Sequence, residues 1–248
     1  MSIHTLHRGG RRYSLNDYST GTSLLPSDIN GLVYWFKGND ISGSQGTHIG
    51  NWPAAYGNAI LTQSTALAQP QLDFTYFGGL PSVKFDGSQQ YFNFSSSISA
   101  GNTFTMLFFM NFPNSPATQE LYCVAAGTPN NQVRISSANS VFTYDNATGY
   151  TSNTFNSPTS SVSKMITAIK PTTTTISWYD STTSLGAGSC GTLQWTTLAH
   201  PFSADTGTWF PGAIAEILLW STSLTDTQIR NLHDNYFKIK YASDSTFT

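Results

Sequence analysis

The chain has 248 residues, a formal net charge of −2 at pH 7 and only 10% charged residues. An average soluble domain carries about 25%. The near-neutral balance argues against nucleic acid as the main partner, because phosphate binding requires a basic surface. The longest apolar run, residues 106–110, is far too short to span a bilayer, so membrane insertion is not expected. No apolar signal-peptide core follows Met1, which favours folding in a cytoplasm.

Residues 1–26 are predicted to form an extended polar arm outside the folded domain. This segment contains Gly9-Gly10 and the one basic cluster of the sequence, formed by Arg8, Arg11 and Arg12. The cluster would dock onto an acidic surface of another chain or remain a solvated tail. Both interpretations stay open at this stage.

Residues 27–248 are predicted to form one β domain, because short apolar runs alternate with turn residues through this whole range. Hydroxyl-bearing and aromatic residues are abundant, and both fit a pleated surface. The expected strands cover residues 32–36, 80–85, 91–94, 104–112, 121–126, 132–135, 141–144, 164–170, 173–179, 193–198 and 213–220.

The last strand is apolar on nearly both faces, which is typical of a central strand. Strict alternation puts Ala215, Ile217 and Leu219 on one face. The other face would hold the remaining large side chains, namely Ile214, Glu216, Leu218 and Trp220.

A helix is predicted directly after this strand. Thr225 and Gln228 have the spacing of a capping box, and Leu224 and Ile229 that of a hydrophobic staple. The apolar stripe of this helix consists of Ile229, Leu232 and Tyr236, with His233 expected on its polar side.

The two cysteines, Cys123 and Cys190, lie in an apolar run and in a glycine-rich stretch. We expect buried free thiols, although a disulfide between them is not excluded. No histidine stands at the spacing of a zinc site, so no metal centre is predicted.

Several motifs in order along the chain resemble the concanavalin A-like, laminin G-like jelly rolls of bacterial surface proteins and phage virion proteins. They are residues 32–43, the Trp52 block with residues 56–59, residues 79–87, and residues 212–220 with the closing helix. The resemblance spans about residues 30 to 241. It implies an all-β, two-sheet antiparallel jelly-roll sandwich with one short C-terminal α-helix, and often glycan binding.

Some members of this family bind calcium. An aspartate often follows Trp-Pro in the Trp52 block, whereas this chain has Ala54 and Ala55 there. A calcium site is therefore not expected, and neither is any other cofactor.

The same superfamily includes glucanases with paired glutamates on one strand, since hydrolysis requires two carboxylates flanking the bond. This chain has only Glu120 and Glu216, each alone in its strand. We expect Glu216 to be a structural acid bonded to backbone groups or hydroxyls. Residues 187–191 with His200 resemble a nucleophile elbow, but a strand-like segment follows where a helix is required. The protein is expected not to be an enzyme.

Exposed aromatic side chains are the better functional candidates, because a sugar ring stacks on an aromatic face and its hydroxyls bind amides and carboxylates. The candidate glycan-binding residues are Trp52, Tyr56, Asn58, Tyr76 and Asp40. The alternative for Trp52 is that it plugs one end of the sandwich.

The expected function is that of a non-enzymatic structural component of a phage or virus particle, as a head decoration, fibre or tail protein. It would be made in the host cytoplasm, reside in the virion and form a homo-oligomer. Other virion proteins would bind the arm, and host glycans are a second class of partner. The alternatives are a carbohydrate-binding module or adhesin, and a glycoside hydrolase.

Overall fold

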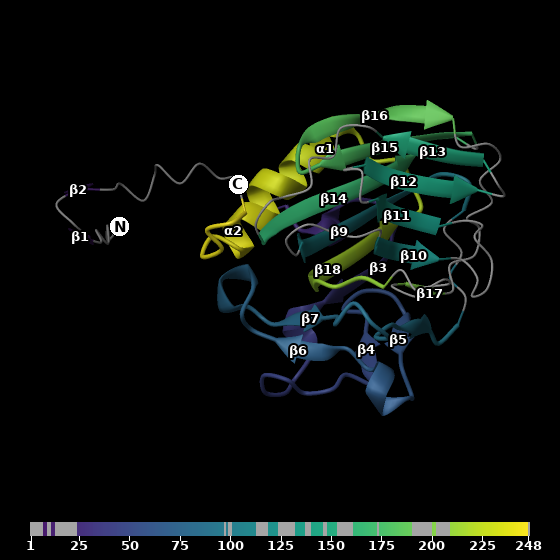
Figure 1. Ribbon diagram of the computed structural model, residues 1–248. Helices are drawn as coiled ribbons and strands as arrows, with labels where there is room; N and C mark the ends of the chain where they lie inside the picture. Colours follow the sequence, from purple (N-terminus) through teal and green to yellow (C-terminus); the bar gives the residue numbers. More distant parts are fainter. Residues whose placement is uncertain are drawn as a thin grey trace.

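The computed structural model describes residues 24–96, 98, 101–112, 161–172, 174–188 and 209–247 in full. For residues 7–8, 11–12, 119–123, 132–136, 140–145, 148–152, 189 and 200–201 it describes the backbone of strands. Two large antiparallel sheets and one short C-terminal helical segment form most of the described fold (Figure 1). The predicted all-β sandwich is therefore confirmed. The predicted strand at 193–198, Cys190 and the side chain of Cys123 lie outside the described residues.

The larger sheet runs in the order β16-β15-β14-β9-β18-β7-β6, and β3 also pairs with β18. Its strands are β16 (Thr183–Ser189), β15 (Thr175–Asp180), β14 (Val162–Lys170), β9 (Phe104–Phe112), β18 (Ala213–Trp220), β7 (Ser82–Lys84), β6 (Gln71–Asp73) and β3 (Leu32–Lys37). Both β7 and β3 use the same edge of β18, one beyond the other. The sheet therefore joins segments from both ends of the chain at its centre.

A five-stranded sheet lies in front of the large sheet in Figure 1 and forms the second layer. Its order is β13 (Thr148–Ser152), β12 (Ser140–Asp145), β11 (Gln132–Ser136), β10 (Gln119–Cys123) and β17 (His200–Pro201). Smaller elements are β1 (His7–Arg8) with β2 (Arg11–Arg12), and the sheet β4 (Asn51–Pro53), β5 (Ile60–Thr62) and β8 (Asn93–Phe94). Short 3₁₀ turns cover Pro26–Asp28, Gly38–Asp40, Ala66–Ala68 and Phe77–Gly79.

Both faces of β9 are buried along its whole length. Alternate residues such as Met106 and Phe108 enter the core between the layers, beside Phe36. Leu107 and Phe109 point the other way, into a second core beneath the C-terminal helix. The large sheet is thus covered on one face by the sandwich partner and on the other by the helix, as a strand of such continuous apolarity requires.

A β-bulge in β18 corrects the predicted alternation of its side chains. Ile214 pairs with Met110 and Glu216 pairs with Phe109, so Ala215 is an extra residue opposite β9. Ile214 therefore enters the core between the layers with Ile217, whereas Glu216 faces the helix. A bulge adds one residue to a strand and shifts its later side chains to the opposite face.

The C-terminal helical segment consists of α1 (Asp226–Leu232), a π-helical turn η6 (His233–Phe237) and α2 (Lys238–Lys240). The predicted capping box is confirmed. The Thr225 hydroxyl accepts from the Gln228 backbone N–H at 3.2 Å, and the Gln228 side chain accepts from the Thr225 N–H at 2.9 Å. Both staple residues, Leu224 and Ile229, are buried in the second core.

The predicted apolar stripe is also confirmed, because Ile229, Leu232 and Tyr236 are all buried there. The prediction that His233 lies on the polar side of the helix was wrong. Its ring is buried, with its centroid 5.1 Å from that of Phe247. The segment after α2 brings Phe247 back over this face of the helix and covers the histidine.

The arm at residues 1–26 stays a prediction. Within this range β1 and β2 pair with each other, and the side chains of Arg8, Arg11 and Arg12 lie outside the described residues. Leu24 packs against the second core, and Pro26 is buried.

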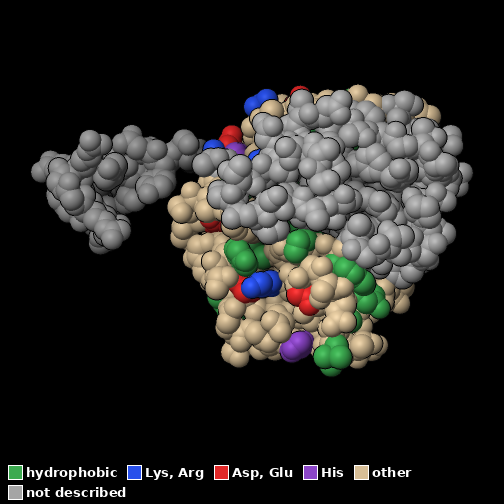
Figure 2. Space-filling view, viewed as in Figure 1, with side chains coloured by type: hydrophobic (Ala, Val, Ile, Leu, Met, Phe, Trp, Pro, Cys, Tyr) green, Lys and Arg blue, Asp and Glu red, His purple; other side chains and the backbone are tan. Residues whose placement is uncertain are grey.

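Figure 2 shows few charged side chains on the described part of the face in view. Most of that surface is formed by backbone and by side chains that are neither charged nor hydrophobic. None of the helices within the described residues has the length and apolarity needed to cross a membrane.

Candidate functional site

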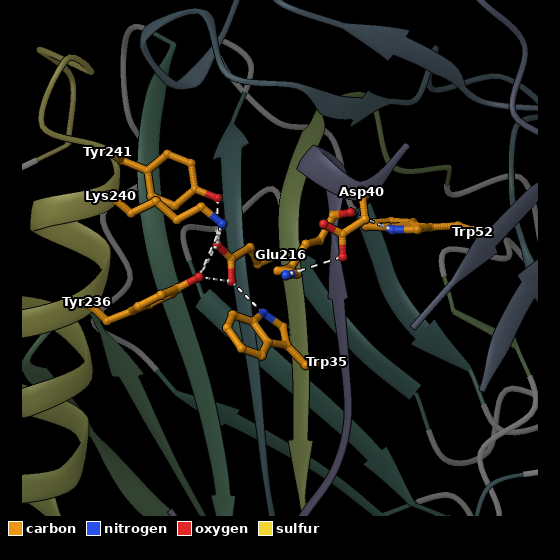
Figure 3. Close-up of polar contacts among 8 residues, drawn as sticks. Trp35, Asp40, Trp52, Glu216, Tyr236, Lys240 and Tyr241 are labelled. Atoms are coloured by element: carbon orange, nitrogen blue, oxygen red, sulfur yellow. Dashed lines mark hydrogen bonds and ion pairs between the residues drawn. The ribbon is translucent and has the colours of Figure 1, made fainter. Parts of the chain in front are cut away.

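The side chain of Glu216 is completely buried and lies at the centre of a polar cluster between β18 and the helix (Figure 3). Its Oε1 accepts hydrogen bonds from the Lys240 ammonium at 2.6 Å, the Tyr241 hydroxyl at 2.7 Å and the Tyr236 hydroxyl at 3.0 Å. Its Oε2 accepts from the indole N–H of Trp35 at 2.6 Å. Glu216 is therefore a structural acid, as expected, and its carboxylate accepts hydrogen bonds from four side chains. Two of these donors are tyrosine hydroxyls.

The two tyrosines of this cluster are held in their protonated form. Burial raises the pKa of Tyr241 well above its ordinary value, and the negative charge of Glu216 raises it further. The pKa of Tyr236 rises for the same two reasons. Both hydroxyls therefore remain donors, and they stabilise the charge of the carboxylate where water does not reach it.

The predicted glycan residue Trp52 is in fact a core residue. It is completely buried, and its ring contacts Phe36 and Phe92 at centroid distances of 5.6 and 6.1 Å. Its indole N–H donates to the Lys37 carbonyl at 3.1 Å. A sugar cannot stack on a ring that is covered on all sides, so the alternative of a plug in the sandwich describes Trp52.

Of the other candidates, Tyr56 is 45% exposed and Asn58 is exposed as well. The backbone of Tyr56 is anchored on β3, because its carbonyl accepts from the Trp35 N–H at 3.2 Å. Asp40 is exposed and forms an ion pair of 3.3 Å with Lys37. Figure 3 shows Asp40 and Trp52 on the side of Glu216 away from the helix.

Tyr76 lines a pocket in the described part of the chain. This pocket has a volume of about 380 Å³ and is lined by residues 75–78, Asn111, Ser161 and residues 243–246. Ligand pockets typically measure about 300–1,000 Å³. The other four predicted glycan-binding residues do not line it; they are Trp52, Tyr56, Asn58 and Asp40. The predicted residues therefore do not form a single site.

A continuous chain of hydrogen bonds forms one wall of the pocket. The Ser161 hydroxyl donates to Asn111 Oδ1, and the Asn111 side-chain amide Nδ2 donates to the Ser163 hydroxyl at 3.2 Å. Thr246 contacts Ser163 at 3.3 Å and donates to Asp244 Oδ1 at 2.7 Å. The wall links β9, β14 and the C-terminal segment, and its polar groups are fixed before any ligand arrives.

Phe77 and Gly78, in the turn Phe77–Gly79, form another part of the lining, and this turn approaches the C-terminal segment very closely. Phe77 has a φ of 52°, in the left-handed region that large side chains rarely occupy. Gly78 has a φ of 66°, and a Cβ there would lie 2.1 Å from the Ser243 Oγ. Only glycine permits this approach, which positions Tyr76 at the rim of the pocket.

Two charged residues, Lys84 and Asp73, lie near Tyr76. The Lys84 ammonium lies 5.9 Å from the centroid of the Tyr76 ring and 3.8 Å from Asp73 Oδ2. Asp73 is buried, which acts to raise its pKa, but hydrogen bonds from Thr75 and Gln45 outweigh burial and lower it. The charge of Lys84 acts in the same direction. Asp73 is therefore an ionised anchor for the loop that carries Tyr76.

Sequence reasoning did not identify Asn111, Asp244 and Thr246 as site residues. They come from segments more than 130 positions apart, and no local motif connects them. One available signal was Asn111, a polar amide inside a mostly apolar central strand. Another was the polar run at 243–246 directly after the helix.

The described residues contain no group of three or more His, Cys, Asp or Glu side chains placed to hold a metal ion.

No protein-family model and no curated protein matches the sequence. The fold is similar to solved structures. Trypanosoma rangeli sialidase in complex with sialic acid aligns with a TM-score of 0.58 and 14% identity, over 85% of this chain and 35% of the sialidase. Domain 4 of AbnA, a GH43 extracellular arabinanase from Geobacillus stearothermophilus, in complex with arabinotriose, aligns with a TM-score of 0.58 and 12% identity, over 82% and 98%.

A third similar structure is the binding domain of Paraclostridial Mosquitocidal Protein 1, with a TM-score of 0.58 and 11% identity, over 83% of this chain and 52% of that one. This chain spans about a third of the sialidase's length. At such identities the likeness shows the fold, and the chain is a β-sandwich domain of this general kind.

Proposed function

We propose that the protein is a non-catalytic β-sandwich that binds carbohydrate in the pocket beside Tyr76. The observation that carries this proposal is the combination in one pocket of an aromatic ring with a fixed polar wall. A half-buried tyrosine offers an apolar face to the C–H groups of a sugar, and Asn111, Thr246 and Asp244 supply polar groups for its hydroxyls. The arabinotriose in the complex with domain 4 of AbnA, 98% of which aligns with this chain, is consistent with a sugar ligand.

The proposal is tested by glycan-array binding followed by calorimetry on the strongest hit. Tyr76→Ala should weaken binding at least tenfold, which corresponds to about 1.4 kcal/mol. Tyr76→Phe should retain most of the affinity because the ring remains. Tyr56→Ala is the matched control, since this exposed tyrosine lies outside the pocket. Equal losses in Tyr76→Ala and Tyr56→Ala would reject the pocket as the binding site.

We also infer that the protein does not hydrolyse its ligand. Both oxygens of Glu216 are occupied by donors and the side chain is completely buried, so it is inaccessible to a glycosidic bond. A hydrolase would require a second carboxylate facing the first across the substrate. Release of reducing sugar from a polysaccharide panel by wild type, and not by Glu216→Gln, would contradict this inference.

The concanavalin A-like, laminin G-like type and the role in a phage or virus particle belong to the same proposal. They are supported by the order of the sequence motifs, the ending of strand β18 plus helix, and the low charge of the chain. A virion component should copurify with particles in fixed stoichiometry. Deleting residues 1–23 should then abolish incorporation while leaving the melting temperature nearly unchanged, because Leu24 and Pro26 stay in place.

A further inference from the structure

The charge of the pocket restricts the sugars that it would accept. Among the lining residues that the structure describes, only Asp244 is charged, and the others offer hydroxyls, an amide, aromatic rings or glycine backbone. We infer that the pocket selects neutral sugars and rejects acidic ones such as sialic and uronic acids. This inference rests on the proposed function, because it names the ligand class of the same site.

Asp244 is built into the pocket wall and is not a mobile surface acid. It is only 8% exposed. Its Oδ1 accepts from the Thr246 backbone N–H at 2.9 Å and from the Thr246 hydroxyl at 2.7 Å. Within the described part of the chain, its Oδ2 has no hydrogen-bond partner and its carboxylate forms no ion pair.

The unpartnered oxygen matters because an ionised aspartate only accepts hydrogen bonds. A buried acceptor without a donor is costly, so the negative charge of Asp244 is only partly compensated within the described residues. The carboxylate of an acidic sugar brings acceptors and a second negative charge. It would be repelled, and more strongly than in bulk water because the wall is buried.

The Lys84 ammonium, which lies 5.9 Å from the centroid of the Tyr76 ring, does not reverse this balance. Lys84 is not among the described lining residues, and its ammonium is 3.8 Å from Oδ2 of the ionised Asp73. The charges of Lys84 and Asp73 offset each other, so Asp244 leaves the described surroundings of the pocket with a net negative charge.

The test uses pairs of glycans that differ only in one acidic sugar. Arabino-, galacto- and gluco-oligosaccharides are each compared with the same oligosaccharide capped by sialic or glucuronic acid, with the full chain and by calorimetry. We expect the neutral member of a bound pair to bind at least tenfold more tightly. Raising the salt concentration should narrow the difference, because salt screens the repulsion. Asp244→Asn keeps the Oδ1 acceptor and should reduce the difference to within about threefold, as loss of one charge predicts.

The possible outcomes distinguish the proposed glycan binding from the inferred preference for neutral sugars. Equal or tighter binding of the acidic member by wild type would overturn the neutral-sugar inference while the binding function stands. A preference that neither salt nor Asp244→Asn changes would also overturn it, since the selection would then be steric. The salt series needs no variant, so it decides the matter even if Asp244→Asn fails to fold. Binding of neither member of any pair would overturn the proposed function and the inference with it.

Discussion

The Tyr241 hydroxyl donates a hydrogen bond of 2.7 Å to Glu216 Oε1 and so ties the end of the C-terminal helix to the centre of the large sheet. Tyr236 and Lys240 reach the same carboxylate from the helix, and Trp35 reaches it from β3. Every partner is a donor, which makes the cluster suited to a carboxylate and to no neutral side chain of the same size.

Replacing Glu216 by glutamine should therefore destabilise the protein by about 2–4 kcal/mol, because an amide N–H₂ would face donors in a buried site. Urea denaturation provides the measurement. Lys238→Met is the matched control and should cost less, since its ion pair with Asp234 is exposed to solvent and lies outside the cluster. Glycan binding should persist in both variants. An unchanged urea midpoint for Glu216→Gln would show that the cluster contributes little to stability.

The stability of the loop that carries Tyr76 should depend on pH through Asp73. The folded-state pKa of Asp73 lies below its ordinary value, because hydrogen bonds from Thr75 and Gln45 outweigh the effect of burial. Its stabilising contribution is then fully present above the unfolded pKa of about 3.9 and is lost as the pH falls through the lower folded value. Asp73→Asn should flatten the decline of unfolding free energy below about pH 4. Parallel pH curves for the two proteins would exclude this role.

Truncating the helix at its buried face should be costly. Leu232 is completely buried in the second core, so Leu232→Ala is expected to lose about 2–5 kcal/mol. Ile239→Ala serves as the comparison, because Ile239 is 64% exposed and its loss should stay within about 0.5 kcal/mol. Similar thermal midpoints for both variants would mean that the helix is not an integral part of the fold.

The capping box should contribute on its own. Thr225→Ala removes the oxygen that accepts from the Gln228 N–H and should cost about 1 kcal/mol in denaturant unfolding. Thr225→Ser retains that oxygen and should stay close to wild type. If serine is as damaging as alanine, the threonine methyl group matters and the cap does not.

Close approach at Gly78 provides a test of the pocket geometry. Gly78→Ala would place a Cβ 2.1 Å from the Ser243 Oγ, so it should lower stability by more than about 1–2 kcal/mol and weaken glycan binding. At Gly46, with a φ of 81°, a Cβ meets nothing within 4 Å. Gly46→Ala therefore carries backbone strain without the clash. Indistinguishable losses in the two variants would show that the clash is relieved by a small movement of Ser243.

Local features of this chain were predictable from sequence, and features made by distant contacts were not. The cap of Thr225 with Gln228 and the stripe through Leu232 depend on neighbouring residues, and both were predicted correctly. The inward turn of Ile214 depends on a bulge opposite β9, which alternation along one strand does not reveal. His233 was misplaced for a similar reason, since Phe247 covers it from outside the helix.

The candidate site was predictable only through Tyr76. An aromatic residue in a polar loop is visible in a sequence, but Trp52 has the same signature and is a core residue. The two differ in what packs on them from elsewhere. Asn111 and Asp244 gain their meaning only when β9 and the C-terminal segment meet at the wall of the pocket.

The pairing of β3 with β18 has a consequence for how the chain folds during synthesis. The indole of Trp35 and the carboxylate of Glu216 meet although 181 positions separate them. Until β18 leaves the ribosome, β3 lacks the strand that it pairs with, and residues 243–246, which line the pocket, emerge later still. Long-range pairing of this kind slows folding, because a large loop must close before the contact forms. The nascent protein should therefore acquire its sheet and its binding pocket late and together, with ligand affinity as a direct measure of completed folding.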